Sequence, residues 1–287
     1  MTAKILLQLD PDDQPSVFDA VVAVDAEVDQ LFRHGGVEAS QVRDLVYGCM
    51  FTRGGYELRN TAIFCGGSQF AAAEALFQQV QKTFFGPVRV STMFDANGCN
   101  TTAAAAVIAA GRHLELSGAT AAVLGGTGPV GQRAVRLLAK AGCRTNVVSR
   151  SFDKANSVCR TIGEKHPDAM LTPFAGVGDA DLQAALQGVS IVIAAGAAGV
   201  EMLSADLRRS CHDLKVAIDL NAVPPVGLTG ISPTDKAKSL DGATVYGALG
   251  VGGLKMKIHK AALRKLFTAN DLVLDAEEIY DLGLQFR

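Results

Sequence analysis

Residues 119–131, ATAAVLGGTGPVG, decide the fold of the middle of the chain. Their apolar first half predicts a buried strand, which leads into a G-x-G-x-x-G pattern at the start of a helix. In this pattern Gly126 makes the tight turn, Gly128 lets a pyrophosphate approach the backbone, and Gly131 lets the helix pack on the strand. The helix begins at Pro129, and its first N–H groups favour phosphate. The stretch predicts a Rossmann-type dinucleotide-binding domain; a tight strand–helix turn without a ligand is the alternative.

The end of the next strand indicates which dinucleotide is bound. NAD-binding folds usually place Asp or Glu there to hold the ribose 2′-hydroxyl, but this strand ends in Ser149-Arg150-Ser151. Arg150 can pair with the 2′-phosphate of NADP, and Lys154 follows one turn later. NADP is therefore the expected cofactor. Use of NAD stays open because one basic residue stands at the strand end, and a merely solvated Arg150 is the alternative.

Two later strand ends complete the predicted cofactor site. The strand at 189–195 is followed by small residues that leave room for the nicotinamide ribose, and the strand at 214–219 is followed by Asn221 and a Pro-Pro turn. Ordinary turn hydrogen bonding is an equal alternative for Asp219 and Asn221. The expected cofactor-binding residues are Gly126, Thr127, Gly128, Pro129, Val130, Gly131, Ser149, Arg150, Ser151, Lys154, Ala195, Gly196, Ala197 and Asn221.

The composition narrows the function classes. With 27 Lys and Arg against 29 Asp and Glu, the 287-residue chain has a formal net charge of -2, so a general nucleic-acid binder is not expected. No apolar run reaches the roughly 20 residues of a membrane span, and the N-terminal apolar run is too short for a signal peptide. Scattered cysteines without a CxxC predict reduced thiols, no metal site and a cytoplasmic protein.

The rest of the chain also alternates short apolar runs with helical patterns, so the fold class is α/β with two lobes. In the first lobe, strands are expected at 4–9, 59–65 and 88–94, and a helix at 15–32. A further helix over 254–267 is expected to return to that lobe. We expect a first, smaller parallel α/β domain over 1–114, the Rossmann-type domain over 115–250, and C-terminal helices over 251–287 that belong to the first domain.

Three polar or glycine-rich stretches are unusual for plain loops. Thr52-Arg53-Gly54-Gly55 breaks the chain before a predicted strand. Residues 95–102, DANGCNTT, follow a strand at the carboxyl edge where open sheets bind ligands. Residues 247–257 are a glycine-rich approach into a helix that carries Lys255 and Lys257. These stretches predict the substrate side of the molecule.

In these three stretches and in the glycine-rich loop at 125–131, the chain resembles the bacterial NAD(P)-dependent methylene-tetrahydromethanopterin dehydrogenases of one-carbon metabolism. The resemblance implies a pterin-binding lobe made from both termini and an NADP lobe in the middle. It also implies hydride transfer from the methylene bridge of the pterin to NAD(P), which leaves a methenyl cation. The resembling blocks run in order along essentially the whole chain: SVFD at 16–19, FTRGG at 51–55, TAIF at 61–64, FFGP at 84–87, DANGCNTTAAA at 95–105, GGTGPVG at 125–131, NAVPPVG at 221–227, GALGVGGLKMKIHKA at 247–261 and DAEEIY at 275–280.

The chemistry implied by the resemblance sets the roles of the site residues. Hydride leaves without a proton, so no general acid or base is strictly required, and catalysis rests on positioning and water exclusion. The expected catalytic residues are Asp95 and Lys255, the latter as a polar anchor at the N-terminal end of its helix; a solvated Lys255 is the alternative. The expected substrate-binding residues are Asp19, Arg53, Asn97, Asn100, Thr102 and Lys257.

Other functions stay open. The carrier can be tetrahydrofolate instead, or the protein can bind NADP without catalysis. A shikimate-dehydrogenase-like enzyme would need a Lys–Asp pair, which Lys4 and Asp95 do not obviously supply. The Tyr-x-x-x-Lys pair of the folate dehydrogenase/cyclohydrolases is missing at Tyr56, so cyclohydrolase activity is not expected. His113 and His259 are assigned no role. A homo-oligomer with a small-molecule pterin substrate, and without nucleic-acid or membrane partners, is expected.

Overall fold

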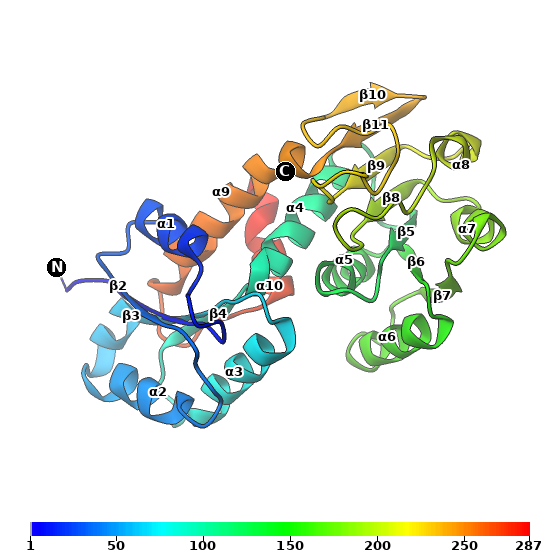
Figure 1. Cartoon of the computed structure of the whole chain (residues 1–287). Helices are drawn as coiled ribbons and strands as arrows, with labels where there is room; N and C mark the ends of the chain where they lie inside the picture. The colour runs from blue at the N-terminus through cyan, green and yellow to red at the C-terminus, as the bar shows by residue number, and fades with distance from the viewer. Residues whose placement is uncertain (1) are drawn as a thin grey trace. The chain divides into compact units, whose positions relative to one another are not determined.

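The computed structural model describes residues 2–287, which fall into two contact units (Figure 1). The first unit contains the chain up to Thr101 together with Met256–Gly283, and the second contains Thr102–Lys255 and Leu284–Arg287. The chain changes unit inside two helices, rather than at the expected positions near 114 and 250. Within residues 2–287, no helix is both long and apolar enough to cross a bilayer.

The first unit is built around a parallel sheet. Within the described residues, its strands stand in the order β12-β4-β3-β1-β2, and each neighbouring pair is parallel. This is the flavodoxin-like order, in which the connections change direction between the first and the third strand. Its elements are β1 (Ile5–Leu9), α1 (Val17–Asp25), β2 (Gln30–His34), α2 (Val42–Phe51), η1 (Gly55–Asn60), β3 (Thr61–Cys65), α3 (Phe70–Thr83), β4 (Ser91–Phe94), η2 (Ala96–Gly98), β12 (Val273–Leu274) and α10 (Ala276–Gly283). Two helices are shared with the second unit: α4 (Cys99–Gly111) belongs to the first unit up to Thr101, and α9 (Ala248–Leu266) belongs to it from Met256.

Helices cover both faces of this first sheet. α1 and α9 lie on one face, where Asp19 and His259 meet Leu6 and Phe64 of the strands. α2 and α3 lie together on the other face, as Figure 1 shows. β3 is buried on both sides, which is why it is apolar from Ala62 to Cys65 rather than alternating.

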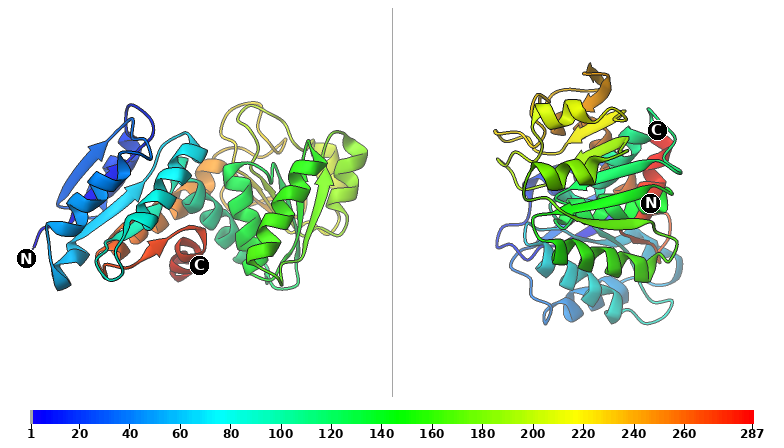
Figure 2. Two further views of the ribbon diagram at one scale, coloured as in Figure 1. Left: turned by 90° about the horizontal axis from the view of Figure 1, so that it is seen from below. Right: turned by 90° about the vertical axis from the view of Figure 1, so that its right-hand side faces the viewer.

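The second unit is a Rossmann-type doubly wound domain. Within the described residues, its strands stand in the order β10-β11-β9-β8-β5-β6-β7, parallel except for β10, which is antiparallel to β11. Helices lie on both sides of these strands (Figure 2). Its elements are β5 (Thr120–Leu124), α5 (Pro129–Lys140), β6 (Arg144–Ser149), α6 (Phe152–Lys165), β7 (Leu171–Ala175), α7 (Asp179–Leu186), β8 (Ile191–Ala194), α8 (Ala205–Ser210), β9 (Val216–Asp219), β10 (Lys238–Leu240), β11 (Ala243–Tyr246) and η3 (Leu284–Phe286).

The strand order places the ligand crevice of the second unit between β5 and β8. Strands β5, β6 and β7 succeed one another to one side of this point, and β8, β9 and β11 to the other. In open sheets of this kind, ligands bind at the carboxyl ends of the strands where the winding direction reverses. The glycine-rich loop after β5 and the small residues after β8 flank this point.

Several elements differ from the sequence-based expectations. The helix predicted over 15–32 ends at Asp25, because the chain turns at Glu27 in a left-handed conformation (φ 65°) and continues as strand β2. The helix expected to begin at Leu254 begins at Ala248 instead, so the glycine-rich approach is itself helical. Lys255 therefore lies well inside α9 and not at its N-terminal end, where we expected it.

Candidate functional site

The loop from β5 to α5 has the backbone shape of a phosphate cradle. Gly125 has φ +74°, and a Cβ there would lie 2.8 Å from the backbone of Gly196 in the loop after β8. A Cβ on Gly131 would overlap the carbonyl oxygen of Gly125. In contrast, a Cβ on Gly128 would meet the protein only at ordinary distances, 3.5 Å and beyond. Gly131 is thus required by packing, whereas Gly128 keeps the outer side of the loop bare.

The start of α5 supplies the donors for an anion. α5 begins at Pro129 after the N-cap residue Gly128, and within the described chain no side chain caps it. The N–H groups of Val130 and Gly131 lie in the first turn, where an α-helix offers no i−4 acceptor. A bare cradle above such a helix start fits the pyrophosphate of a dinucleotide.

The residues after β6 lie against the same loop. The hydroxyl oxygens of Thr127 and Ser149 are 3.2 Å apart, and Ser149 Oγ accepts a hydrogen bond from the N–H of Ser151 at 3.3 Å. The side chain of Ser151 in turn caps α6 by accepting from the N–H of Lys154. The end of β6 is therefore held beside the cradle.

The charged side chains after β6 point outward. Arg150 and Lys154 are both exposed, which leaves their cationic groups accessible to a 2′-phosphate. The first acid after the strand, Asp153, lies in the first turn of α6 and is also exposed. The strand end itself holds no carboxylate, as the sequence indicates.

Asn221 and Asp219 form an internal turn. The Asp219 carboxylate accepts from the N–H groups of Asn221 at 3.0 Å and Leu228 at 2.8 Å. Asn221 Oδ1 accepts from the N–H of Val223, and its Nδ2 donates to the carbonyl oxygen of Pro225. Burial raises the pKa of Asp219. The side chain of Asn221 thus fixes the conformation of the loop after β9. This loop would therefore contact a cofactor through its backbone rather than through the Asn221 amide.

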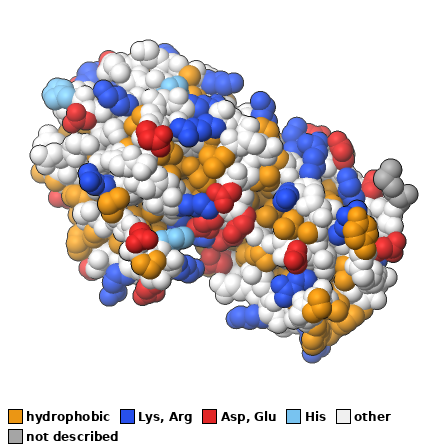
Figure 3. Space-filling view, turned by 180° about the vertical axis from the view of Figure 1, so that it is seen from behind, with side chains coloured by type: hydrophobic (Ala, Val, Ile, Leu, Met, Phe, Trp, Pro, Cys, Tyr) orange, Lys and Arg blue, Asp and Glu red, His pale blue; other side chains and the backbone are white. Residues whose placement is uncertain are grey.

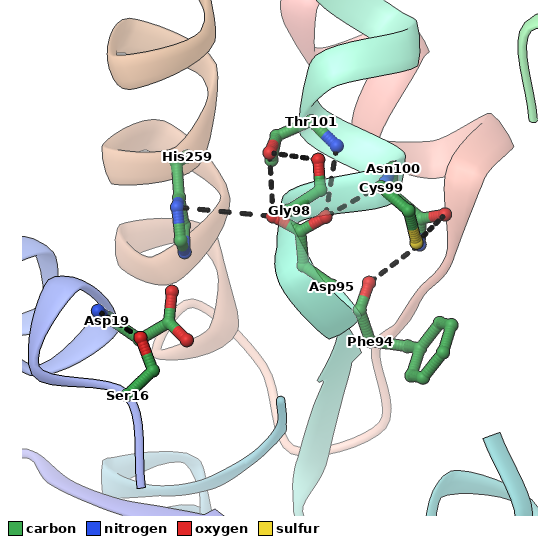
Figure 4. A network of polar contacts seen from close by, with 9 residues as sticks. All are labelled: Ser16, Asp19, Phe94, Asp95, Gly98, Cys99, Asn100, Thr101 and His259. Carbon is green, nitrogen blue, oxygen red and sulfur yellow. Dashed lines mark hydrogen bonds and ion pairs between the residues drawn. The ribbon is translucent and has the colours of Figure 1, made fainter. Parts of the chain in front are cut away.

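Asp95 occupies the carboxyl end of β4 in the first unit and is completely buried (Figure 4). Its Oδ1 accepts from the N–H groups of Asn100 at 2.8 Å and Thr101 at 3.0 Å. Its Oδ2 accepts from the hydroxyl of Thr101 at 2.6 Å and lies 3.9 Å from Nδ1 of His259. The carboxylate therefore holds the first turn of α4, a geometry that suits positioning of the loop better than direct contact with a substrate.

The neighbours of Asp95 divide into buried and accessible residues. Asn100 is buried, and its Nδ2 donates to the carbonyl of Phe94 at 2.6 Å and to Oδ1 of Asp275 at 2.9 Å. Asn97 is exposed at the tip of η2 with a left-handed backbone (φ 50°), so its amide is free to face a ligand. Thr102 is half-buried on α4.

Asp19, Asp95 and His259 come from three elements and point into the same space (Figure 4). Asp19 lies in the first turn of α1, which Ser16 caps by accepting from the N–H of Asp19. The ring of His259 stacks on Phe64 with centroids 5.8 Å apart. On α9, Lys255 precedes His259 by one helical turn and is half-buried, whereas Lys257 is exposed.

The winding of the first sheet reverses between β1 and β3, and the loops that follow these strands touch there. A Cβ on Gly67 would lie 2.8 Å from Oδ1 of Asp10. Oδ2 of Asp12 accepts from the N–H of Ser68 at 2.7 Å, which lowers the pKa of Asp12, whereas burial raises the pKa of Asp10. An open sheet binds ligands where its winding direction reverses. The loops after β1 and β3 are therefore a second candidate ligand site, in addition to the one between β5 and β8.

Arg53 does not lie at the carboxyl edge of the first sheet. Its Nη1 donates to the carbonyl oxygen of Asn60 at 2.6 Å and to the hydroxyl of Thr61 at 3.1 Å. Those residues lie at the amino end of β3, opposite the carboxyl edge that carries Asp95. Lys4 precedes β1 at the same amino edge. The structure therefore brings neither Arg53 nor the Lys4–Asp95 pair of a shikimate-dehydrogenase-like site to the ligand edge.

Two residues of the first unit that belong to this arrangement were not predicted from the sequence. His259, which was assigned no role, is buried beside Asp95; its i+4 spacing from Lys255 on one helix is the signal that links the two. Asp10 follows the buried run of β1 directly, and strand order was needed to show that this position is the reversal point. Within residues 2–287, no three His, Cys, Asp or Glu side chains are grouped as a metal site would need.

Comparisons with known proteins agree with this geometry. A family model described as methylene-tetrahydromethanopterin dehydrogenase, N-terminal, matches residues 17–97, and one described as putative NAD(P)-binding matches residues 113–228. The solved structure of shikimate 5-dehydrogenase from Listeria monocytogenes is similar in fold, with a TM-score of 0.56, 14% identity, and coverage of 98% of this chain and 96% of that chain. Ligand-free 5-ketofructose reductase of Gluconobacter sp. has a TM-score of 0.55 and 14% identity over 100% of this chain and 99% of its own.

The fold, the cradle and the NAD(P)-binding match together define an NAD(P)-binding dehydrogenase. The curated relatives narrow this class. The chain is 43% identical to the bifunctional protein MdtA of Methylorubrum extorquens, over 99% of both chains. It is 29% identical to the NAD(P)-dependent methylenetetrahydromethanopterin dehydrogenase of the same organism, again over 99% of both. The chain belongs to the methylene-tetrahydromethanopterin dehydrogenase family and is an oxidoreductase.

Proposed function

We propose that the protein transfers a hydride from methylene-tetrahydromethanopterin to NADP and releases methenyl-tetrahydromethanopterin. The observation that carries the proposal is the family match of the N-terminal part together with the phosphate cradle of the second unit. Such a reaction would serve the oxidation of one-carbon units at the formaldehyde level. The relative from Methylorubrum extorquens that is named as an NAD(P)-dependent methylenetetrahydromethanopterin dehydrogenase supports the same substrate class.

NADP is the proposed cofactor because of the residues after β6. When bound, the dinucleotide supplies the hydride acceptor. The cradle between Gly125 and Gly131 would hold its pyrophosphate, with the hydroxyls of Thr127 and Ser149 beside it. Exposed Arg150 would pair with a 2′-phosphate, and the absence of a carboxylate from the strand end removes the group that would repel one.

The proposed pterin site lies at the carboxyl edge of the first sheet. Asn97 offers an exposed amide there, and the carboxylates of Asp10 and Asp19 lie directly after β1 and in the first turn of α1. The amino and N–H groups of a pterin are hydrogen-bond donors, so carboxylate and amide oxygens suit them. Asp95 holds the start of α4, and Lys255 serves as a polar anchor on α9. Arg53 is left out of this proposed site because of its place at the other edge.

The chain's own contribution to the reaction is positioning. Loss of hydride from the methylene carbon produces a delocalised cation, so no proton has to be moved in the same step. Fixed side chains at the two carboxyl edges would orient the reactants, and exclusion of water would protect the methenyl product.

The decisive experiment is a steady-state assay of the purified protein with a matched set of carriers. Methylene-tetrahydromethanopterin and methylene-tetrahydrofolate are each offered with NADP and with NAD, and reduced cofactor is followed by absorbance. We expect the highest kcat/KM for the methanopterin carrier with NADP. A higher kcat/KM for the folate carrier would show that methylene-tetrahydrofolate is the substrate instead. NADP binding without turnover of either carrier would show that the protein binds the cofactor but does not catalyse this reaction.

A further inference from the structure

The loop after β8 contacts both the phosphate cradle and one methionine side chain. A Cβ on Gly125, in the cradle, would lie 2.8 Å from Cα and N of Gly196 in this loop. A Cβ on Gly196 would in turn overlap Sδ of Met202 and lie 2.8 Å from the methyl carbon of the same side chain. The backbone of Gly196 is therefore in close contact with the turn of the cradle and with the Met202 thioether.

The second of these contacts gives Gly196 a role within the protein. On the sequence alone, the small residues after β8 are expected to leave room for the nicotinamide ribose. In the structure, the three atoms nearest to a Cβ on Gly196 all belong to Met202. The space that a side chain at position 196 would occupy is thus filled by Met202.

Met202 is held in place by the loop after β9. Its N–H donates to the carbonyl oxygen of Gly227 at 2.8 Å, and the N–H of Leu203 donates to the same oxygen at 3.1 Å. The residue after Gly227, Leu228, donates its N–H to the carboxylate of Asp219 at 2.8 Å. Leu203, Leu228 and Asp219 are all buried. The segment that holds Met202 is therefore itself anchored in the core of the second unit.

Partial exposure alone does not distinguish Met202 from other apolar residues. Hydrophobic side chains reach the surface at many places in Figure 3, as is normal for a globular protein. Met170, which is 46% exposed just before β7, is an example in the same unit. Met202 differs because its half-buried side chain packs against the hydrophobic core and also touches the loop beside the cradle. A flexible thioether is well suited to filling an irregular space of this kind.

We propose that Met202 is a positioning residue for the dinucleotide. Its thioether supports the backbone of Gly196, and Gly196 supports the turn at Gly125. Met202 thereby holds the cradle in the shape in which its N–H groups reach the pyrophosphate, without touching the cofactor itself. This role rests on the place proposed above for the dinucleotide and is independent of the identity of the carrier.

Two ligands separate the cradle from the rest of the cofactor site. NADP contains the pyrophosphate, whereas adenosine 2′-monophosphate carries the 2′-phosphate but has no phosphate at the 5′ position for the cradle to bind. Met202→Ala is expected to weaken NADP binding about tenfold, the effect of one lost charge-assisted hydrogen bond. The affinity for adenosine 2′-monophosphate should stay within about twofold of the parent, because a loss of one bond at the cradle does not reach it. Calorimetric titration measures both affinities.

Two further variants serve as controls for Met202→Ala. Met202→Leu keeps a carbon atom near the position of the sulfur, so it should retain most of the NADP affinity. Met170→Ala removes a methionine side chain at the opposite, amino edge of the same sheet, and it should bind both ligands like the parent. A loss that comes from the removal of any methionine would appear in Met170→Ala as well.

A double-mutant cycle tests the contact itself. Gly196→Ala places a methyl group where Sδ of Met202 lies, so on its own it should also weaken NADP binding. When Gly196→Ala is combined with Met202→Ala, the added methyl group takes part of the space that the thioether has left. NADP affinity in the double variant should therefore recover to within about threefold of the parent, which is the non-additivity expected of two groups in direct contact.

The recovery decides between the two roles of position 196. If the bare glycine serves the nicotinamide ribose, Gly196→Ala weakens NADP binding whichever residue stands at 202, and a double variant without recovery would overturn the proposal. Unchanged NADP affinity in Met202→Ala, or an equal loss for both ligands in a folded variant, would also overturn it. A parent that binds neither NADP nor NAD would show instead that the proposed cofactor site is wrong, and the role of Met202 with it. Circular dichroism verifies folding, and Met202→Val repeats the test if Met202→Ala does not fold.

Discussion

The hydroxyl of Thr101 donates a 2.6 Å hydrogen bond to Oδ2 of Asp95, and both residues are completely buried. Two backbone N–H groups of the first turn of α4 donate to the other carboxylate oxygen. A buried carboxylate that accepts three hydrogen bonds from one helix start acts as its cap. Since the same helix start follows the exposed Asn97, the cap also fixes the tip of the proposed pterin site.

Replacement of Asp95 is expected to affect both stability and substrate binding. Asp95→Ala removes the cap and leaves buried donors unsatisfied, so the free energy of unfolding should fall by about 2 kcal/mol. Thr101→Val removes one of the three bonds and should cost about 1 kcal/mol. Turnover or pterin affinity should fall in Asp95→Ala while NADP binding stays nearly unchanged. Denaturant unfolding and separate titrations with the two ligands measure these effects; equal loss of NADP binding in a folded variant would contradict the assignment of Asp95 to the pterin side.

Sequence reasoning succeeded where local chemistry sets the structure. The glycine spacing at 126–131 predicts the helix start and the packing, because a Cβ on Gly126 or Gly131 would overlap neighbouring atoms, whereas Gly128 leaves the outer side of the loop open. The left-handed turn itself lies at Gly125 rather than at Gly126, where we expected the tight turn. The predictions from the sequence were wrong where the role of a segment depends on its position in the tertiary structure. β2 is an edge strand with mostly exposed residues, so it lacks the apolar alternation that marks a strand, and the predicted helix ran through it. Arg53 lies in a glycine-rich break like those of binding loops, but the strand order puts it at the opposite edge.

Lys255 offers a test of the substrate side. Lys255→Ala should lower kcat or raise the KM for the pterin by about tenfold, because a charged hydrogen bond contributes about 1.5 kcal/mol or more. NADP affinity should stay within about twofold of the parent. Lys265→Ala on the same helix is the matched control, since Lys265 is exposed near the end of α9. Steady-state kinetics with each substrate varied in turn decides between this outcome and a solvated Lys255, for which both variants would behave like the parent.

The two glycines of the cradle should respond differently to the same added methyl group. Gly131→Ala places a Cβ on the carbonyl of Gly125, so it should lower the free energy of unfolding by about 2 kcal/mol or more. Gly128→Ala finds only ordinary contacts within the protein, so its cost should stay below about 1 kcal/mol. The new methyl group would instead occupy the space proposed for the pyrophosphate, and NADP affinity should fall. Thermal unfolding and NADP titration of both variants make the comparison; full NADP affinity in Gly128→Ala would place the phosphate elsewhere.

Asp12 is expected to give a pH-dependent contribution to stability. The N–H of Ser68 holds the pKa of Asp12 below its usual 3.8 in the folded chain. A lowered pKa means that the folded state favours the carboxylate, so this stabilisation is present above pH 3.8 and is lost as the pH falls through the lower folded value. Asp12→Asn removes the titration. The difference in free energy of unfolding between parent and Asp12→Asn should therefore shrink below about pH 4; a difference that grows on acidification would show the opposite shift.

Arg150 is the residue on which the cofactor preference depends. If it pairs with the 2′-phosphate, Arg150→Ala deletes a charge-assisted contact that NADP makes and NAD does not. Because Arg150 is exposed, the contact should contribute about 1.5 kcal/mol, the low end for such bonds, or about tenfold in NADP affinity. The variant should have a higher KM for NADP and an almost unchanged KM for NAD. Added salt should weaken NADP binding more than NAD binding in the parent.

Arg160→Ala is the matched control for this prediction, since Arg160 is an exposed cation on the same helix α6 but lies farther along the chain from the cradle. It should leave the ratio of the two Michaelis constants as it is in the parent. If Arg150→Ala leaves that ratio unchanged as well, Arg150 is a solvated residue before α6. The preference would then have to come from neutral groups such as Ser149 and Thr127, whose hydroxyls already lie together at the cradle.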